Sequence, residues 1–154
     1  MKERSGEPWM AADAYGRSLR GMGVNLLVRE VARSVAFLTE VLALDLVYAD
    51  ADFAVLRYGN REGGGQEGGG QDVILHADHT YAEHPLLALT GGGALRGAGV
   101  EMRLYGIDPD AAEARARTRG DAVFAATQDK PHGLRECYLA DPDGYIWVPG
   151  IGIG

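Results

Sequence analysis

The sequence predicts an α+β fold made of two βαβββ units. The expected order of elements (strand, helix, strand, strand, strand) occurs twice along the 154 residues. The two helices begin at Val31 and Pro109, 78 positions apart, and the strands that follow them begin at Leu46 and Ala122, 76 positions apart. A nearly constant offset is typical of a duplicated supersecondary unit. With 46% hydrophobic and 24% charged residues, the composition is that of a globular domain with a buried core.

The first predicted unit spans residues 21–77. Residues 23–29 form a short apolar segment rich in branched side chains, which is typical of a buried strand. A helix follows, because apolar residues recur from Val31 onward at spacings of four, three and four. Three strands are expected after this helix, at residues 46–48, 53–58 and 72–77. The turn-forming sequence Asp50-Ala51-Asp52 separates the first two of these strands.

The second predicted unit spans residues 99–150 and repeats this order. Its first strand, residues 99–105, alternates apolar and polar side chains, which indicates one buried face. Asp108 is expected to cap a helix that starts at Pro109 and ends at Gly120. Three further strands are expected at residues 122–125, 134–139 and 145–148.

The remaining segments are interpreted as connections within a single domain. Residues 1–20 are polar and lack periodicity, which predicts an irregular arm lying on the surface or on a partner subunit. Residues 78–98 form the linker between the two units. Clustered glycines mark flexible connections, and they occur at residues 63–65, 68–70 and 91–93.

The charge and cysteine content exclude several classes of protein. Fifteen Lys and Arg residues against 22 Asp and Glu residues give a net charge of −7, which a nucleic-acid backbone would repel. No apolar stretch is long enough to span a bilayer, and the first 20 residues do not resemble a signal peptide. The single cysteine, Cys137, cannot form an internal disulfide and is expected to be packed in the core. We therefore expect a cytoplasmic protein with neither a nucleic-acid partner nor a membrane partner.

Two stretches of the sequence resemble those of a known superfamily. Residues 28–37 read VREVARSVAF, a strand-to-helix phrase that ends in a serine and an aromatic residue. Residues 133–136 read GLRE, and residues 141–145 read DPDGY, as in a closing hairpin. Together with the duplication, these phrases resemble the vicinal oxygen chelate superfamily of glyoxalases, bleomycin-resistance proteins and extradiol dioxygenases. The resemblance covers residues 21–149. It implies a glyoxalase/bleomycin-resistance-like fold, in which the two units form a cup-shaped mixed half-barrel, and a homodimer.

The resemblance also implies one divalent metal ion held by four side chains on the floor of the cup. Carried over one at a time, these positions fall on Gly23, Leu75, Met102 and Val148. None of these residues supplies a usual oxygen, nitrogen or thiolate donor, so the sequence predicts no metal cofactor. The alternative is one divalent metal ion at His76 and Glu101, which would both turn into the cup if the strand register shifted by one residue.

The candidate ligand-binding residues are those that the cup would present to a small organic molecule: Asn25, His76, Glu101, Arg103 and Trp147. His76 is also the candidate catalytic residue, because an imidazole titrates near neutral pH. Glu101, Arg103 and Tyr105 share one face of their strand, and that face is either the cavity wall or the solvent side. Trp147 either stacks on a ligand or fills the core.

The first hypothesis for function is a metal-independent small-molecule-binding protein of the resistance type. The alternative is a metal-dependent lyase, isomerase or dioxygenase that uses His76 and Glu101. A third possibility is a metal-free enzyme in which His76 is the general base and Arg103 or Arg135 stabilises an enolate-like charge.

Overall fold

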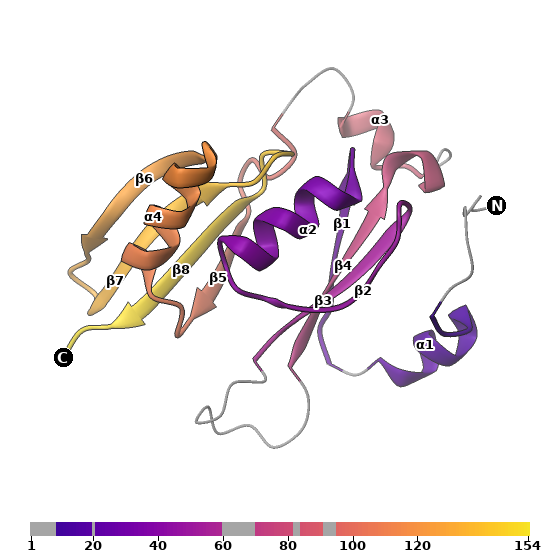
Figure 1. The fold of residues 1–154 in the computed structure, drawn as a ribbon, viewed down its shortest axis with the longest axis horizontal. Coiled ribbons are helices and arrows are strands. Elements are labelled where there is room, and N and C mark those ends of the chain that lie inside the picture. Colours follow the sequence, from indigo (N-terminus) through magenta and orange to yellow (C-terminus); the bar gives the residue numbers. More distant parts are fainter. Residues whose placement is uncertain (1–8, 20, 60–69, 82–83, 91–94) are drawn as a thin grey trace. The chain divides into compact units, whose positions relative to one another are not determined.

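The structure of the protein, a computed structural model, describes residues 9–19, 21–59, 70–81, 84–90 and 95–154. The described residues form two compact units. The first unit comprises Met1–Val35 and Leu44–His84, and the second comprises Ala36–Ala43 and Pro85–Gly154. Figure 1 labels the helices and strands of both units. Each unit contains one four-stranded mixed sheet, so the predicted α+β fold with two βαβββ units is confirmed.

The sheet of the first unit has the strand order β1-β4-β3-β2. Its strands are β1 (Val24–Val28), β2 (Asp45–Ala49), β3 (Phe53–Tyr58) and β4 (Gln71–Ala77). β1 and β4 are parallel, and the other neighbours are antiparallel. The helix α2 (Val31–Glu40) follows β1, and its first turns belong to this unit. The glycine cluster at 63–65 and most of the one at 68–70 lie outside the described residues.

The two faces of the first sheet differ in polarity. One face is apolar and buried, with Leu26, Val28, Ala54, Leu56 and Leu75 all at most 7% exposed. The pairing register places Phe53 beside His76, and Asn25 and Val55 beside Ile74, on the opposite face. This opposite face also carries the buried apolar side chains of Leu27 and Val55. We call it the first polar face and define it by Asn25, Tyr48, Phe53 and His76.

The prediction that residues 1–20 are wholly irregular is wrong, because residues Ala12–Ser18 form the helix α1. Its Tyr15 ring packs edge-on against Phe53, and the preceding Trp9 stacks on Tyr48. These contacts are made with strands far along the chain. Local periodicity therefore carried no signal for the helix, which depends on tertiary packing.

The sheet of the second unit has the strand order β5-β8-β7-β6. Its strands are β5 (Glu101–Tyr105), β6 (Ala122–Asp129), β7 (Leu134–Ala140) and β8 (Ile146–Gly152). β5 and β8 are parallel, and the other neighbours are antiparallel. The helix α4 (Pro109–Arg119) lies against β6, β7 and β8, as Figure 1 shows.

The second sheet also has one buried face and one polar face. Met102, Cys137, Leu139 and Trp147 lie on the face that α4 covers, and each is at most 9% exposed. The Cys137 thiol is fully buried, as expected, and burial raises its pKa to about 11. We call the opposite face the second polar face and define it by Glu101, Arg103, Tyr105, Glu136 and Tyr138.

The predicted start and end of α4 are confirmed. The Asp108 side chain accepts hydrogen bonds from the backbone N–H groups of Asp110 and Ala111, and Pro109 begins the helix. Gly120 ends it in the left-handed conformation, at φ = 81°, which a residue without Cβ adopts at little cost.

The described residues of the segment between β4 and β5 include two short helices, and turns at residues 85–86 and 96–99. The helices are η1, a 3₁₀ helix (Asp78–Tyr81), and α3 (Leu87–Thr90). The glycine cluster at 91–93 lies outside the described residues. No helix in the described ranges is both long and apolar enough to cross a membrane.

Candidate functional site

The first polar face carries a hydrogen-bonded pair of side chains from its two parallel strands. The Asn25 amide oxygen lies 2.7 Å from Nδ1 of His76. An amide oxygen can only accept, so Nδ1 carries the proton, and Nε2 of the neutral ring is then an acceptor. Asn25 is exposed and His76 is half-buried, so the pair lies at the surface of the first unit. A polar molecule could hydrogen-bond to both residues there.

The same face of the sheet also carries the Phe53 ring and the ion pair of Arg57 and Asp72. The Phe53 ring lies 4.7 Å from the imidazole of His76, centroid to centroid. Arg57 and Asp72 form an ion pair, with Nε and Oδ1 2.8 Å apart. Burial, and then the negative charge of Asp72, raise the pKa of the Tyr15 hydroxyl to about 12. Tyr15 is therefore a neutral phenol at physiological pH.

Arg103 is the centre of a hydrogen-bonded network on the second polar face. Its Nη1 donates to Glu101 at 2.8 Å, its Nε donates to the Tyr105 hydroxyl at 3.2 Å, and its Nη2 donates to Glu136. Glu136 also accepts from the Tyr138 hydroxyl at 3.2 Å. The network therefore joins one guanidinium to two carboxylates and two phenols on strands β5 and β7.

The electrostatics of this network fix the charge of its central group. Burial works against the charged guanidinium of Arg103, but the hydrogen bonds with Glu101, Tyr138 and Tyr105 outweigh it, and the pKa of Arg103 is raised. Only 1% of Glu136 is exposed, so its carboxylate depends on its neighbours for compensation: Arg103 contacts it directly, and Nε2 of His132 lies 3.7 Å away. A buried carboxylate on a sheet face is costly, and such groups are concentrated at functional sites.

Two of the four positions carried over from the superfamily lie on the opposite sheet face from the polar residue beside them, whereas Val148 is the register partner of Arg103 and shares its face. Leu75 and Met102 lie on the buried faces of their sheets. His76 and Glu101 lie on the polar faces, as in the alternative register. The position assigned to Leu75 was therefore one residue away from the side chain on the polar face, because alternate residues of a strand point to opposite sides.

Trp147 and Arg135 are not on the second polar face. Trp147 is fully buried on the face that α4 covers, and its Nε1 donates to Asp141 Oδ2 at 3.0 Å. Arg135 pairs with Asp110 and Asp129. Its register with Ile151 places it on the opposite face of the sheet from Arg103. The structure therefore gives Trp147 a core position and leaves Arg103 as the arginine on the second polar face.

The donor set fits a divalent metal ion poorly. Among the residues that the structure describes, no three or more His, Cys, Asp or Glu side chains are grouped so that they could hold a metal ion. In the second unit, the guanidinium of Arg103 contacts both Glu101 and Glu136, so a divalent cation on those carboxylates would meet a positive charge. In the first unit, Nδ1 of His76 is already engaged by the Asn25 amide oxygen.

Two members of the network, Glu136 and Tyr138, were not among the sequence candidates. Both lie on β7, two positions apart, so they share a face. The alternation of β7 could have placed them together, but their pairing with Arg103 joins residues more than 30 positions apart. No local pattern in the sequence reports such a contact.

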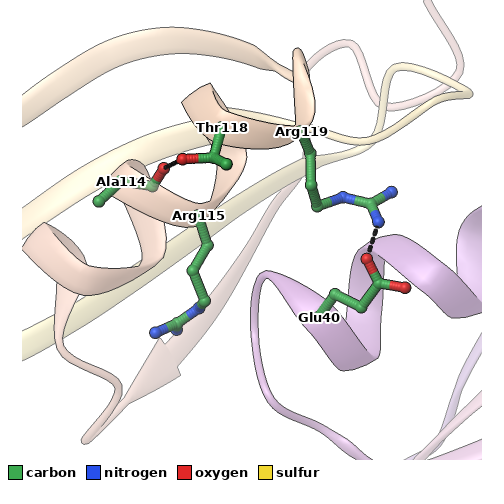
Figure 2. Close-up of a pocket in the computed structure, with 5 residues that line it drawn as sticks. All are labelled: Glu40, Ala114, Arg115, Thr118 and Arg119. Carbon is green, nitrogen blue, oxygen red and sulfur yellow. Dashed lines mark hydrogen bonds and ion pairs between the residues drawn. The ribbon is translucent and has the colours of Figure 1, made fainter.

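A pocket of about 320 Å³ in the second unit is lined by helix residues and not by residues of the polar sheet faces. Figure 2 shows its lining: Glu40, Ala114, Arg115, Thr118 and Arg119. Arg115 donates from Nε and Nη2 to the Val41 carbonyl oxygen, at 2.9 and 2.7 Å, and Arg119 pairs with Glu40 and Asp121. Carbonyl groups at a helix C-terminus need such donors. These arginines therefore have a structural role, and the pocket is not a candidate ligand site.

No protein-family model matches the sequence, and no curated protein matches it significantly. Solved structures do match. A glyoxalase/bleomycin resistance protein/dioxygenase from Nocardioides is 22% identical, covers 92% of both chains and has a TM-score of 0.59. A glyoxalase-related enzyme from Fulvimarina pelagi is 16% identical over 87% of this chain and 89% of its own, with a TM-score of 0.63.

A third match is a lactoylglutathione lyase from Agrobacterium tumefaciens. It is 18% identical over 86% of this chain and 93% of its own, with a TM-score of 0.58. At such identities the likeness concerns the fold and carries no substrate from one protein to another. The resemblance inferred from the duplicated units is confirmed at this level: the chain has the fold of the glyoxalase/bleomycin resistance/dioxygenase proteins of the vicinal oxygen chelate superfamily.

Proposed function

We propose that this chain binds small organic molecules without a metal ion, and that the polar face of each unit, taken by itself, offers hydrogen-bonding groups to such a molecule. The observation that carries the proposal is the Arg103–Glu136 pair, an arginine held by a buried carboxylate on the sheet face opposite α4. Keeping a charged pair there costs stability that apolar residues would not. Asn25 and His76 supply a second group of hydrogen-bonding atoms in the first unit.

The charges around Arg103 support metal independence. The carboxylate of Glu101 already compensates Arg103, so using it as a metal ligand would break that ion pair. The homodimer and the cytoplasmic location stay predictions.

The experiment is a ligand screen of the metal-free protein. Isotope-labelled protein in excess EDTA is titrated with a library of small polar organic molecules, and binding is followed by the NMR signals of the Asn25 amide and the Arg103 Nε–H. We expect ligands that shift these signals. Their affinity should fall about tenfold in Arg103→Lys, which keeps the charge but loses the planar set of donors.

The control is Arg117→Lys, which alters an exposed arginine of α4 paired with Glu113 and should leave affinity unchanged. Binding that appears only after Mn²⁺, Zn²⁺ or Ni²⁺ is added would contradict the proposal. It would favour the metal-dependent lyase, isomerase or dioxygenase that uses His76 and Glu101.

A further inference from the structure

Four aromatic rings pack in a closed cluster on the first polar face, and two of them belong to the N-terminal segment, residues 9–19. The Trp9 ring lies 5.9 Å from Tyr48 and 6.0 Å from Tyr15, centroid to centroid. Phe53 completes the cluster, at 6.1 Å from Tyr15 and 6.4 Å from Tyr48. With both N-terminal rings in place, Phe53 is only 7% exposed. The N-terminal segment therefore occupies the aromatic part of this face.

The first polar face has an apolar part that includes more than its aromatic rings. Leu27 and Val55 lie on the same face as Phe53, and they are 3% and 0% exposed. Tyr15 packs on Phe53 and also lies close enough to Asp72 for that charge to act on its hydroxyl. Burial raises the pKa of this hydroxyl to about 12, so the phenol is desolvated where it meets the sheet. This part of the face therefore attracts apolar groups in general, whether they come from the chain or from a ligand.

The helix α1 needs its contacts with the sheet in order to form. It has seven residues, none of them buried, and its N-cap residue Ala11 makes no side-chain hydrogen bond. Gly16 lies in its interior, where glycine is less favourable than alanine, and no neighbouring group among the described residues lies within 4 Å of the place that a Cβ would take. Trp9 keeps 42% of its surface exposed. A helix of this length is not stable alone in water, so a docked segment with so little buried surface opens more readily than the sheet.

We propose that residues 9–19 form an autoinhibitory segment: when docked, it closes the apolar part of the first polar face, and a molecule binds to that part only while the segment is released. Asn25 is exposed and His76 is half-buried with the segment docked, so a small polar molecule still reaches that pair. A molecule with an apolar body has to displace Trp9 and Tyr15. Its apparent affinity is then reduced by the fraction of chains in the released state. This inference rests on the proposed function, to which it adds a control of access.

Two substitutions in the full-length protein move the docking equilibrium in opposite directions. The Tyr15 backbone N–H donates to the Ala11 carbonyl oxygen at 2.9 Å, so it exchanges with solvent deuterium when α1 opens. Trp9→Ala removes the stacked ring and should speed this exchange roughly tenfold. Gly16→Ala strengthens the helix without a clash and should slow the exchange about fivefold. Neither substitution alters Tyr15 or the preceding Ala14, so the exchange rate of Tyr15 in the open chain stays the same.

The probe for the uncovered face is anilinonaphthalene sulfonate, a dye that binds exposed apolar surface. It is titrated in EDTA, and its dissociation constant at this face is taken from NMR shifts of the Asn25 side-chain amide. Its affinity should rise roughly tenfold in Trp9→Ala and fall about fivefold in Gly16→Ala, matching the changes in exchange, because only the released form binds it. By the same linkage, a saturating amount of probe should speed Tyr15 exchange in the unsubstituted protein.

The matched controls are Phe124→Ala and Gly152→Ala, which make the same kinds of change in the second unit. Phe124 is an aromatic residue of β6 that is 72% exposed. Gly152 lies on β8, and no neighbouring group in the described part of the chain lies within 4 Å of its Cβ position. Both controls should leave Tyr15 exchange and probe affinity unchanged. Circular dichroism of each variant checks that the sheets remain folded.

Four outcomes would overturn the inference. Unchanged Tyr15 exchange in Trp9→Ala would show that this ring does not hold the segment in place. Altered exchange with unchanged probe affinity would show that the segment opens without controlling access. A probe that slows Tyr15 exchange binds beside the docked segment, and an Asn25 signal that shifts in no variant means that release uncovers no binding surface. The ligand screen at the Arg103 signal reports on the second unit by itself, so failure of this inference and failure of the proposed function are distinguishable.

Discussion

Replacement of Arg103 by alanine is expected to lower the free energy of unfolding by about 3 to 5 kcal/mol. Glu136 is 1% exposed and loses its guanidinium partner in this variant, so its buried carboxylate is left with the Tyr138 hydroxyl at 3.2 Å and with His132, whose Nε2 lies 3.7 Å away. For a chain of this length, the melting temperature should fall by roughly 10 °C. Urea denaturation followed by circular dichroism measures the change in free energy.

A second substitution separates the buried charge from the general loss of packing. Arg103→Ala combined with Glu136→Gln should recover part of the lost stability, because the glutamine carries no charge to compensate. Arg117→Ala is the matched control. It removes an exposed arginine that pairs with Glu113 one helical turn away, and it should cost no more than about 0.5 kcal/mol. A loss below about 1 kcal/mol in Arg103→Ala would show that Glu136 does not depend on this arginine.

Asp141→Ala should have an effect of similar size, about 3 to 5 kcal/mol, for a different reason. The side chain of Asp141 accepts from the backbone N–H of Asp143 at 2.9 Å, from that of Tyr145 at 3.0 Å and from Trp147 Nε1 at 3.0 Å. Burial raises the pKa of Asp141, and these three hydrogen bonds work against that rise. The alanine variant leaves all three donors without an acceptor in a buried turn.

Asp141→Asn tests how much of this loss comes from the hydrogen bond with Trp147. The asparagine keeps an oxygen for the two backbone N–H groups but turns an NH₂ donor toward the indole, so its loss should be intermediate. Asp129→Ala, which removes an exposed carboxylate paired with Arg135, should cost less than about 1 kcal/mol. Equal stability of Asp141→Ala and Asp129→Ala would refute the structural role of this turn.

Most elements of the fold could be predicted because their signals are local. The capped start of α4 at Asp108, its glycine end and the turn before Tyr145 each depend on a few adjacent residues. The face that a residue of β4 presents could not be predicted in this way. Its sequence Val73-Ile74-Leu75 is continuously apolar, so alternation did not show that Leu75 is buried and that His76 lies on the polar face.

The remaining parts of the site depend on contacts between distant residues. Glu136 is a charged residue in a strand, and its burial is explained by its contacts with Arg103, Tyr138 and His132, which the sequence does not show. Trp9 and Tyr15 lie in a polar segment, and their packing partners Tyr48 and Phe53 are more than 30 positions away. Tertiary packing of this kind leaves no periodic signal in the segment itself.

Metal content tests the proposed function most directly. The protein is purified untagged and without chelators, its metals are measured by mass spectrometry, and the measurement is repeated on His76→Ala. We expect neither form to hold Ni, Zn, Mn or Fe near one equivalent, with ligand binding unaffected by EDTA. A near-stoichiometric metal that is lost in His76→Ala would contradict metal-independent binding and would make metal-dependent chemistry the function to assay.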